Sequence, residues 1–183
     1  MTAALIVIDV QRALFETSPP PADADAVLGR INDLTDRARA AGVPVIYVQH
    51  ESAGSPFMPG QPAWELDTRL TPLLEDVRVR KTTPDSFHGT ILGQTLADAG
   101  VTELVVCGYA TEFCVDTTVR RAAGLGLPVT LAADAHTTQD KPHATGAQIR
   151  AHHNATLSAI ASFGVKIAAV PAADIVFPPT APR

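Results

Sequence analysis

The stretch "ELVVCGYATEFCVDTTVRRAAGLG", residues 103–126, joins two different hydrophobic patterns without a break. Residues 103–109 form a short, largely apolar run, which is typical of a strand buried on both faces. Residues 112–126 have the spacing of an amphipathic helix that stops at a glycine. Cys114 lies one turn into this helix, directly after the strand. It is therefore either an inert core thiol or a nucleophile, and the rest of the chain must distinguish the two.

The same alternation of strand-like and helix-like segments continues along the chain. Short β-branched runs predict strands over residues 4–10, 43–49, 77–81, 103–109, 128–134 and 165–170. Apolar residues at helical spacing predict helices over residues 25–42, 90–100, 112–126 and 144–164. Such alternation favours a parallel sheet covered on both faces. We therefore expect one α/β domain over residues 1–183, a three-layer Rossmann-like fold with a six-stranded, mostly parallel sheet and helices on both faces.

Length, composition and charge exclude several classes of protein. The chain has 183 residues, of which 46% are hydrophobic and 18% charged, as in a folded protein with a sizeable core. The net charge of −5 is scattered, so we expect neither a nucleic-acid partner nor a membrane partner. Asp9 interrupts the first apolar run and no basic region precedes it, which argues against a signal peptide or membrane span. Two cysteines are too few for a disulfide framework, which favours a reducing, cytoplasmic location.

Three reactive side chains follow the ends of three predicted strands. Asp9 lies at the end of the first strand, Lys81 at the end of the third, and Cys114 just beyond the fourth. The carboxyl ends of parallel strands meet at one edge of the sheet, where ligands bind. Each residue alone has an ordinary explanation: a turn for the acid, a solvated surface for the amine, and core packing for the thiol. Their convergence at one edge favours a catalytic group.

An acid, an amine and a thiol at one edge can act together in covalent catalysis. A cysteine attacks as its thiolate, and a nearby cation or helix N-terminus lowers the pKa of the thiol. Lys81 supplies the cation, so we expect a lowered pKa for Cys114. Asp9 can take the thiol proton and return it to a leaving group. Backbone N–H groups of the 108–114 turn can stabilise an oxyanion.

At these residues the sequence resembles the isochorismatase-like cysteine hydrolases, a superfamily that includes nicotinamidase and N-carbamoylsarcosine amidohydrolase. The resemblance covers nearly the whole chain and rests on "LIVIDVQRALF" (5–15), "RKTTPDSFHGTIL" (80–92) and "LVVCGYATEFCVDTTVRRAAGLG" (104–126). It implies a catalytic triad of Asp9, Lys81 and Cys114. It also implies a non-proline cis peptide bond between Tyr109 and Ala110, which directs the Ala110 N–H, beside that of Cys114, into an oxyanion hole.

The region after the second predicted strand departs from the metal-binding members of this superfamily. Nicotinamidases have an Asp-x-His motif there, whereas this chain has Val48 two positions before His50. A single histidine is more often a hydrogen-bonding or surface residue than a metal ligand. We therefore expect no bound metal and no cofactor.

The combined prediction is a metal-independent hydrolase in which Cys114 attacks a small amide or related C–N substrate and forms an acyl intermediate. Hydrolysis of an isochorismate-like ether is one alternative; authentic isochorismatases cleave a vinyl ether without using this cysteine, so Cys114 favours amide chemistry over it. A non-catalytic small-molecule-binding or scaffold protein on the same fold is another. A thiol redox sensor is a third, although no suitable resolving cysteine lies near Cys114.

Pocket walls and assembly are predicted from the aromatic residues and the long loop. The candidates for the substrate pocket are Gln11, Phe15, Trp64, Phe87 and Tyr109. The loop over residues 51–72 has apolar side chains among prolines and glycines and cannot form a core of its own. We expect a homodimer or homotetramer in which this loop contributes Trp64 to the pocket or to a subunit contact.

Overall fold

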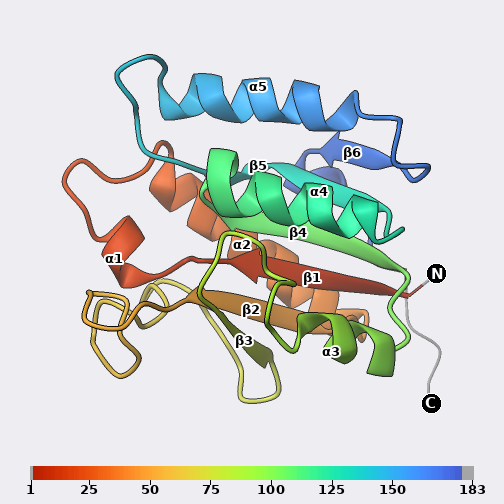
Figure 1. The fold of residues 1–183 in the computed structure, drawn as a ribbon, viewed down its shortest axis with the longest axis horizontal. Coiled ribbons are helices and arrows are strands. Elements are labelled where there is room, and N and C mark those ends of the chain that lie inside the picture. The colour runs from red at the N-terminus through yellow and green to blue at the C-terminus, as the bar shows by residue number, and fades with distance from the viewer. Residues whose placement is uncertain (1, 179–183) are drawn as a thin grey trace.

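Six strands form one sheet in the computed structural model, which describes residues 2–178 (Figure 1). The strands are β1 (Ala3–Ile8), β2 (Val45–His50), β3 (Val77–Lys81), β4 (Glu103–Tyr109), β5 (Val129–Thr137) and β6 (Ile167–Val170). Their order is β3-β2-β1-β4-β5-β6, and all neighbouring pairs are parallel. The strand order reverses between β1 and β4, and ligands bind to such sheets at the carboxyl ends of the strands beside this reversal.

Helices cover both faces of the sheet. They are α1 (Arg12–Phe15), α2 (Ala24–Ala40), α3 (Leu92–Asp98), α4 (Asp116–Gly124) and α5 (Gly146–Ser158), with a π-helical turn η1 (Thr111–Val115) before α4 and a 3-10 turn η2 (Ala172–Asp174) after β6. In Figure 1, α2 lies behind the sheet, and α3, α4 and α5 lie in front of it. Alternate residues of β1 explain the two layers, because Leu5 and Val7 join the core that contains α2, whereas Ile6 and Ile8 join the core that contains the other three helices. The predicted three-layer α/β fold is confirmed.

The largest departures from the predicted bounds occur in three elements, whereas the other predicted elements agree within two residues at each end. The predicted helix 112–126 is divided, because its first turn is the π-helical η1 and regular α-helix begins with α4. The predicted strand 128–134 extends to Thr137, because its last residues continue to pair with β4. The predicted helix 144–164 ends at Ser158, and turns follow it.

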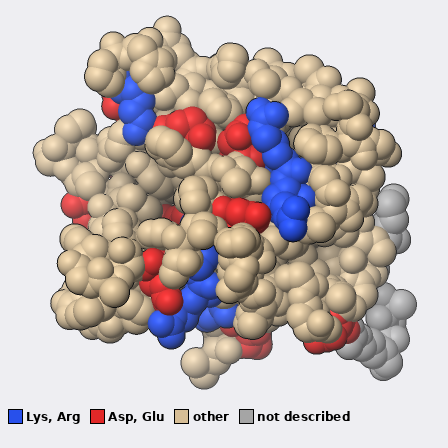
Figure 2. All heavy atoms as spheres, in the orientation of Figure 1, with Lys and Arg blue, Asp and Glu red and all other residues tan. Residues whose placement is uncertain are grey.

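Residues 51–72 form the long loop that the sequence predicts. They contain no helix or strand, and an isolated bridge joins Leu66 to Gln11. In the face shown in Figure 2, Lys and Arg side chains are interspersed with Asp and Glu, without a broad area of one sign. Across residues 2–178, no helix has the length and apolar character needed to cross a membrane.

A glycine allows β1 and β4 to approach closely at their carboxyl ends. A Cβ atom at Gly108 would lie 2.1 Å from the carbonyl oxygen of Ile8, and the φ angle of Gly108 is 118°. A side chain at this position would meet backbone atoms and would also need a conformation that L residues rarely adopt. The close approach brings the residue after Ile8, which is Asp9, next to the turn that follows Gly108.

Candidate active site

Asp9 follows β1 directly, and its carboxylate lies below the surface. Its φ angle of 49° falls in the left-handed region, which Asp tolerates better than most residues. The Asp9 N–H donates to the carbonyl oxygen of Val48 at 2.8 Å, which ties the end of β1 to β2. Asp9 is 2% exposed. A carboxylate buried to this degree needs a partner if it is to remain charged.

Lys81, the last residue of β3, is that partner. Its Nζ lies 2.6 Å from Asp9 Oδ2 and 3.2 Å from Cys114 Sγ. Lys81 is also 2% exposed, so solvent and salt screen these interactions very little. The three side chains that the sequence places at separate strand ends therefore meet in one buried group, with the ammonium in contact with both the acid and the thiol.

Cys114 lies in η1, and its thiol is half-buried. Burial raises the pKa of this thiol to about 12; the nearby Asp9 carboxylate adds to the increase and Lys81 opposes it. The prediction that Lys81 lowers the pKa of Cys114 below its usual range is therefore wrong for this site, because burial and the carboxylate outweigh the ammonium. The resting residue is a protonated thiol, which needs a base before it can act as a nucleophile.

Asp9 has a second oxygen that is free to accept a proton. Oδ2 accepts a hydrogen bond from the Lys81 ammonium. Oδ1 is buried and has no hydrogen-bond partner in the part of the chain that the structure describes. A buried acceptor without a donor costs about 1–3 kcal/mol and needs an explanation. The explanation offered by this site is that Oδ1 belongs to the same buried group as a protonated thiol, and the thiol needs a proton acceptor when it reacts.

A hollow of about 220 Å³ opens beside Cys114. Asp9 and Cys114 line it together with Tyr109 and Ala110, which the structure joins by a cis peptide bond, as the family resemblance implies. The remainder of the lining is made mainly of apolar and aromatic side chains. The hollow therefore has room for a carbonyl-sized group against the thiol, between mainly apolar walls.

Tyr109 is the one residue of the five predicted for the pocket that lines this hollow. Phe15 is 2% exposed and packs behind Tyr109 in the core, with their ring centroids 5.8 Å apart. Phe87 is partly buried and packs against the core cluster that contains α3 and α4. Both phenylalanines thus pack against the hydrophobic core, and neither lines the hollow.

Gln11 and Trp64 also lie outside the hollow. The Gln11 side chain is fully buried, where its amide donates to the carbonyl oxygens of His50 at 3.0 Å and Trp64 at 2.7 Å and accepts from the His50 N–H at 2.9 Å. Gln11 therefore fastens β2 and the long loop to the start of α1. Trp64 lines a separate cavity of about 410 Å³. Its ring lies 5.9 Å from the Arg80 guanidinium.

Sequence reasoning misses five residues of the wall, which are Leu14, His50, Phe57, Pro84 and Phe113. Phe57 comes from loop 51–72, and its ring lies 5.4 Å from that of His50 at the end of β2. Phe113 could have been found from its place immediately before Cys114. The loop was the right segment to suspect, but its contribution to the hollow is Phe57 and not Trp64.

The histidine considered as a possible metal ligand lies in this wall. Burial, and then the charge of Lys81, lower the pKa of His50, so its imidazole is neutral at neutral pH. Within residues 2–178, no group of three or more His, Cys, Asp or Glu side chains is arranged to hold a metal ion. The acid and the thiol of the site instead both contact the Lys81 ammonium.

His136 anchors the turn that carries Cys114. Its ring nitrogens lie 2.8 Å from Thr111 Oγ1 in η1 and 2.9 Å from Asn154 Oδ1 in α5. Burial lowers the pKa of His136 to about 4, so the ring stays neutral and can donate at one nitrogen and accept at the other. This bridge fixes η1 against α5.

The fold and the site together define the class of this protein: an α/β protein of the isochorismatase type, with an acid, an amine and a thiol at the carboxyl edge of a parallel sheet. The Isochorismatase domain model matches residues 3–167. The chain therefore belongs to the isochorismatase family.

Several relatives and solved structures are similar to this chain. A streptothricin hydrolase from Streptomyces noursei is 46% identical over 144 residues, which cover 78% of this chain and 57% of the relative. A ureidoacrylate amidohydrolase from Methylobacterium radiotolerans is 32% identical over 164 residues, covering 65% of this chain and 60% of the relative. The chain thus spans less than two thirds of the length of both. The crystal structure of an isochorismatase from Pseudomonas putida superimposes with a TM-score of 0.85 at 32% identity, covering 95% of this chain and 90% of that one.

Proposed function

We propose that this protein is a metal-independent cysteine hydrolase that cleaves a small amide or related C–N bond through an acyl intermediate on Cys114. One observation carries the proposal: the buried Lys81 ammonium lies 2.6 Å from Asp9 and 3.2 Å from Cys114. A structural ion pair needs no thiol beside it. A nucleophile with its base and a cation in contact is the arrangement that covalent catalysis requires.

The first step transfers the thiol proton as the bond to substrate forms. Because the pKa of Cys114 is about 12, few molecules hold a free thiolate, and Asp9 removes the proton as sulfur attacks the carbonyl carbon. Lys81 stabilises the negative charge that passes from Asp9 to sulfur and then to the substrate. The protonated Asp9 then gives its proton to the leaving nitrogen, so the C–N bond breaks and a thioester remains.

Backbone N–H groups stabilise the oxyanion of each tetrahedral intermediate. Ala110 and Cys114 both line the hollow, and we assign their N–H groups to this role. In the second step Asp9 takes a proton from water and the water oxygen attacks the thioester carbon. The C–S bond then breaks, the acid product leaves, and Asp9 returns the proton to sulfur, which restores the thiol. No metal is needed, because every proton and charge in the cycle has a partner among these residues.

Amide chemistry is favoured over ether cleavage by the nucleophile and by the relatives. A thiol that forms an acyl intermediate suits carbonyl substrates, and ether hydrolysis gives it no role. One of the relatives above is an amidohydrolase by name, and the other is a hydrolase of streptothricin. We therefore place the substrate among small amides and ureido compounds.

Turnover and intermediate trapping test this proposal. The protein is incubated, with and without a chelator, with a panel of small amides that includes ureidoacrylate and streptothricin. Products are followed by mass spectrometry, and rapidly quenched samples are digested to look for an acyl group on the Cys114 peptide. We expect chelator-resistant turnover and an adduct on Cys114 alone. Turnover without any adduct, or turnover that a chelator abolishes and zinc restores, would contradict the mechanism.

A further inference from the structure

We propose that a second cavity beyond Phe113 receives the distal part of the substrate and selects a neutral hydrogen-bond donor there, through the Glu112 carboxylate. This inference rests on the proposed function, because it assigns a substrate class to the same site. Its evidence is a cavity next to the hollow, an aromatic wall common to both, and a buried acceptor without a donor.

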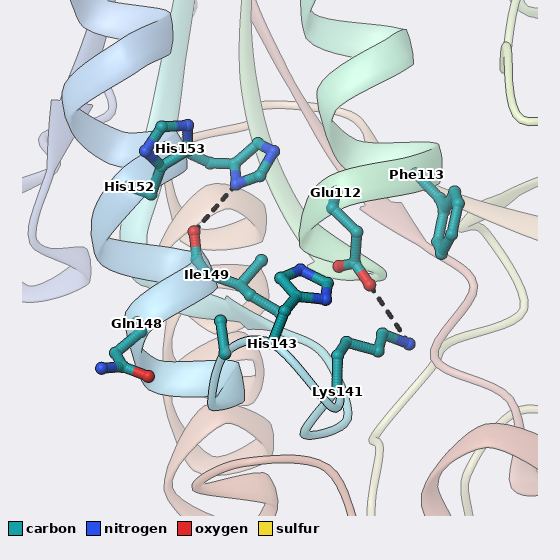
Figure 3. A pocket seen from close by; sticks show the side chains of 9 residues that line it. Glu112, Phe113, Lys141, His143, Gln148, Ile149, His152 and His153 are labelled. Atoms are coloured by element: carbon teal, nitrogen blue, oxygen red, sulfur yellow. Dashed lines mark hydrogen bonds and ion pairs between the residues drawn. The ribbon is translucent and has the colours of Figure 1, made fainter.

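The second cavity is larger than the hollow and shares the Phe113 side chain with it as a wall. Its volume is about 700 Å³, compared with about 220 Å³ for the hollow beside Cys114. Phe113 lines both spaces and is 55% exposed, although it is a large apolar side chain. A molecule that filled both spaces would cover this ring. The remaining walls come from η1, the segment around residues 141–144 and the first half of α5 (Figure 3).

Glu112 supplies the specific polar contact of this cavity. Its Oε1 accepts from Thr138 Oγ1 at 2.9 Å and lies 3.3 Å from Lys141 Nζ. Its Oε2 is buried and has no hydrogen-bond partner among residues 2–178. Figure 3 shows the carboxylate pointing toward Lys141 and His143. A buried carboxylate oxygen without a donor is costly, and a ligand N–H or O–H group would remove that cost.

The charges around Glu112 favour a neutral donor over a cationic one. Lys141 already balances the charge of Glu112, and its Nζ also lies 5.7 Å from the centre of the Phe113 ring. The other polar groups of the wall are a glutamine and three histidines, which are His143, His152 and His153. A ligand ammonium at Oε2 would therefore meet the Lys141 ammonium with no second carboxylate to offset it. A hydroxyl or amide N–H satisfies Oε2 without that repulsion.

Binding to a turnover-free variant tests the second cavity separately from catalysis. In Cys114→Ala, dissociation constants are measured by calorimetry for three matched series of amides of graded chain length, which end in a methyl, a hydroxyl or an ammonium group. At one chain length we expect the hydroxyl amide to bind about tenfold more tightly than both the methyl and the ammonium amide. Because no turnover is involved, failure here is distinct from failure of Cys114 to form an adduct.

A matched pair of variants assigns the preference to Glu112. Glu112→Gln in the same background keeps an oxygen for Thr138 but presents an amide N–H in place of Oε2. A ligand hydroxyl can then form only a neutral hydrogen bond, as an acceptor, so the tenfold preference for hydroxyl over methyl should fall to about threefold or less. Glu103→Gln, at the opposite end of β4, should retain it. Equal affinities for the methyl and hydroxyl series at every length would overturn the inference, even if Glu112→Gln did not fold. Tightest binding of the ammonium series would overturn the choice of a neutral donor.

Discussion

The edge of the sheet and the loops around it are built in different ways. At the edge, Asp9 and Lys81 are each 2% exposed and form an ion pair of 2.6 Å. In the surrounding wall, Phe113 is 55% exposed and Phe57 belongs to a loop without helix or strand. The reactive groups thus depend on strand pairing and buried electrostatics, whereas the walls depend on loop conformation. Substitutions at the edge should remove chemistry and often stability, and substitutions in the wall should change substrate preference.

The largest expected effect separates the two cysteines. Cys114→Ala removes the nucleophile, so kcat should fall at least about a thousandfold, while the thermal midpoint changes little because the thiol is half-buried. Cys107→Ala is the matched control: this residue is fully buried in β4, so its truncation should cost about 1–2 kcal/mol of stability and leave turnover in place. Steady-state kinetics and urea unfolding measure both effects. Comparable loss of turnover in the two variants would remove the special role of Cys114.

The next effect concerns the ion pair. Lys81→Met leaves the Asp9 carboxylate buried without its partner, so the free energy of unfolding should fall by about 3–5 kcal/mol, and kcat/KM should fall with it. The double variant Asp9→Asn/Lys81→Met removes both charges, and we expect it to regain part of the stability but none of the turnover. Urea unfolding of the three proteins checks the first point, and amide turnover the second. A Lys81→Met protein as stable as the parent would contradict a buried pair.

The pH dependence of alkylation tests the electrostatics of Cys114 in the protein without substrate. Because its pKa is raised to about 12, the thiolate fraction should increase about tenfold per pH unit through the range above neutral pH. The rate of iodoacetamide labelling, followed by mass spectrometry of the Cys114 peptide, should increase in the same way. Lys81→Met removes the group that opposes the increase in pKa, so labelling should become slower at each pH. A plateau near pH 8.5 would show an unperturbed thiol.

The same contrast explains what could be predicted from the sequence. Asp9, Lys81 and Cys114 lie at strand ends, and parallel pairing alone brings such positions together, so apolar runs and spacing were sufficient to find them. The pKa of Cys114 was not predictable in this way, because it depends on how deeply η1 is buried and on which charge lies nearest. Most residues that line the hollow were not predicted either, because their positions also depend on the three-dimensional structure and not on a sequence pattern. Whether Phe57 or Trp64 faces the hollow is determined by turns in loop 51–72, and the sequence contains no periodic signal for them.

A further prediction concerns the approach of the two central strands. Gly108→Ala places a Cβ atom 2.1 Å from the Ile8 carbonyl oxygen at a φ angle of 118°, so the backbone must shift at the site itself. We expect a loss of about 3 kcal/mol in stability together with reduced turnover. Gly93→Ala in α3 is the control, because nothing lies within 4 Å of its Cβ position. It should stabilise the helix by up to about 1 kcal/mol. Equal unfolding midpoints for the two variants would contradict the close approach.

The smallest effects should separate two aromatic residues of loop 51–72. Phe57 lines the hollow and contacts His50, so Phe57→Ala should raise KM for small amides about three- to tenfold with little change in kcat. Trp64 lies at a separate cavity, and we propose that it contributes to a homodimer or homotetramer contact. Trp64→Ala should therefore weaken assembly, measured by light scattering over a dilution series, with a smaller effect on KM than Phe57→Ala. A parent protein that is monomeric at micromolar concentration would refute the assembly. A larger KM effect for Trp64→Ala would show that the loop presents a different face to the substrate.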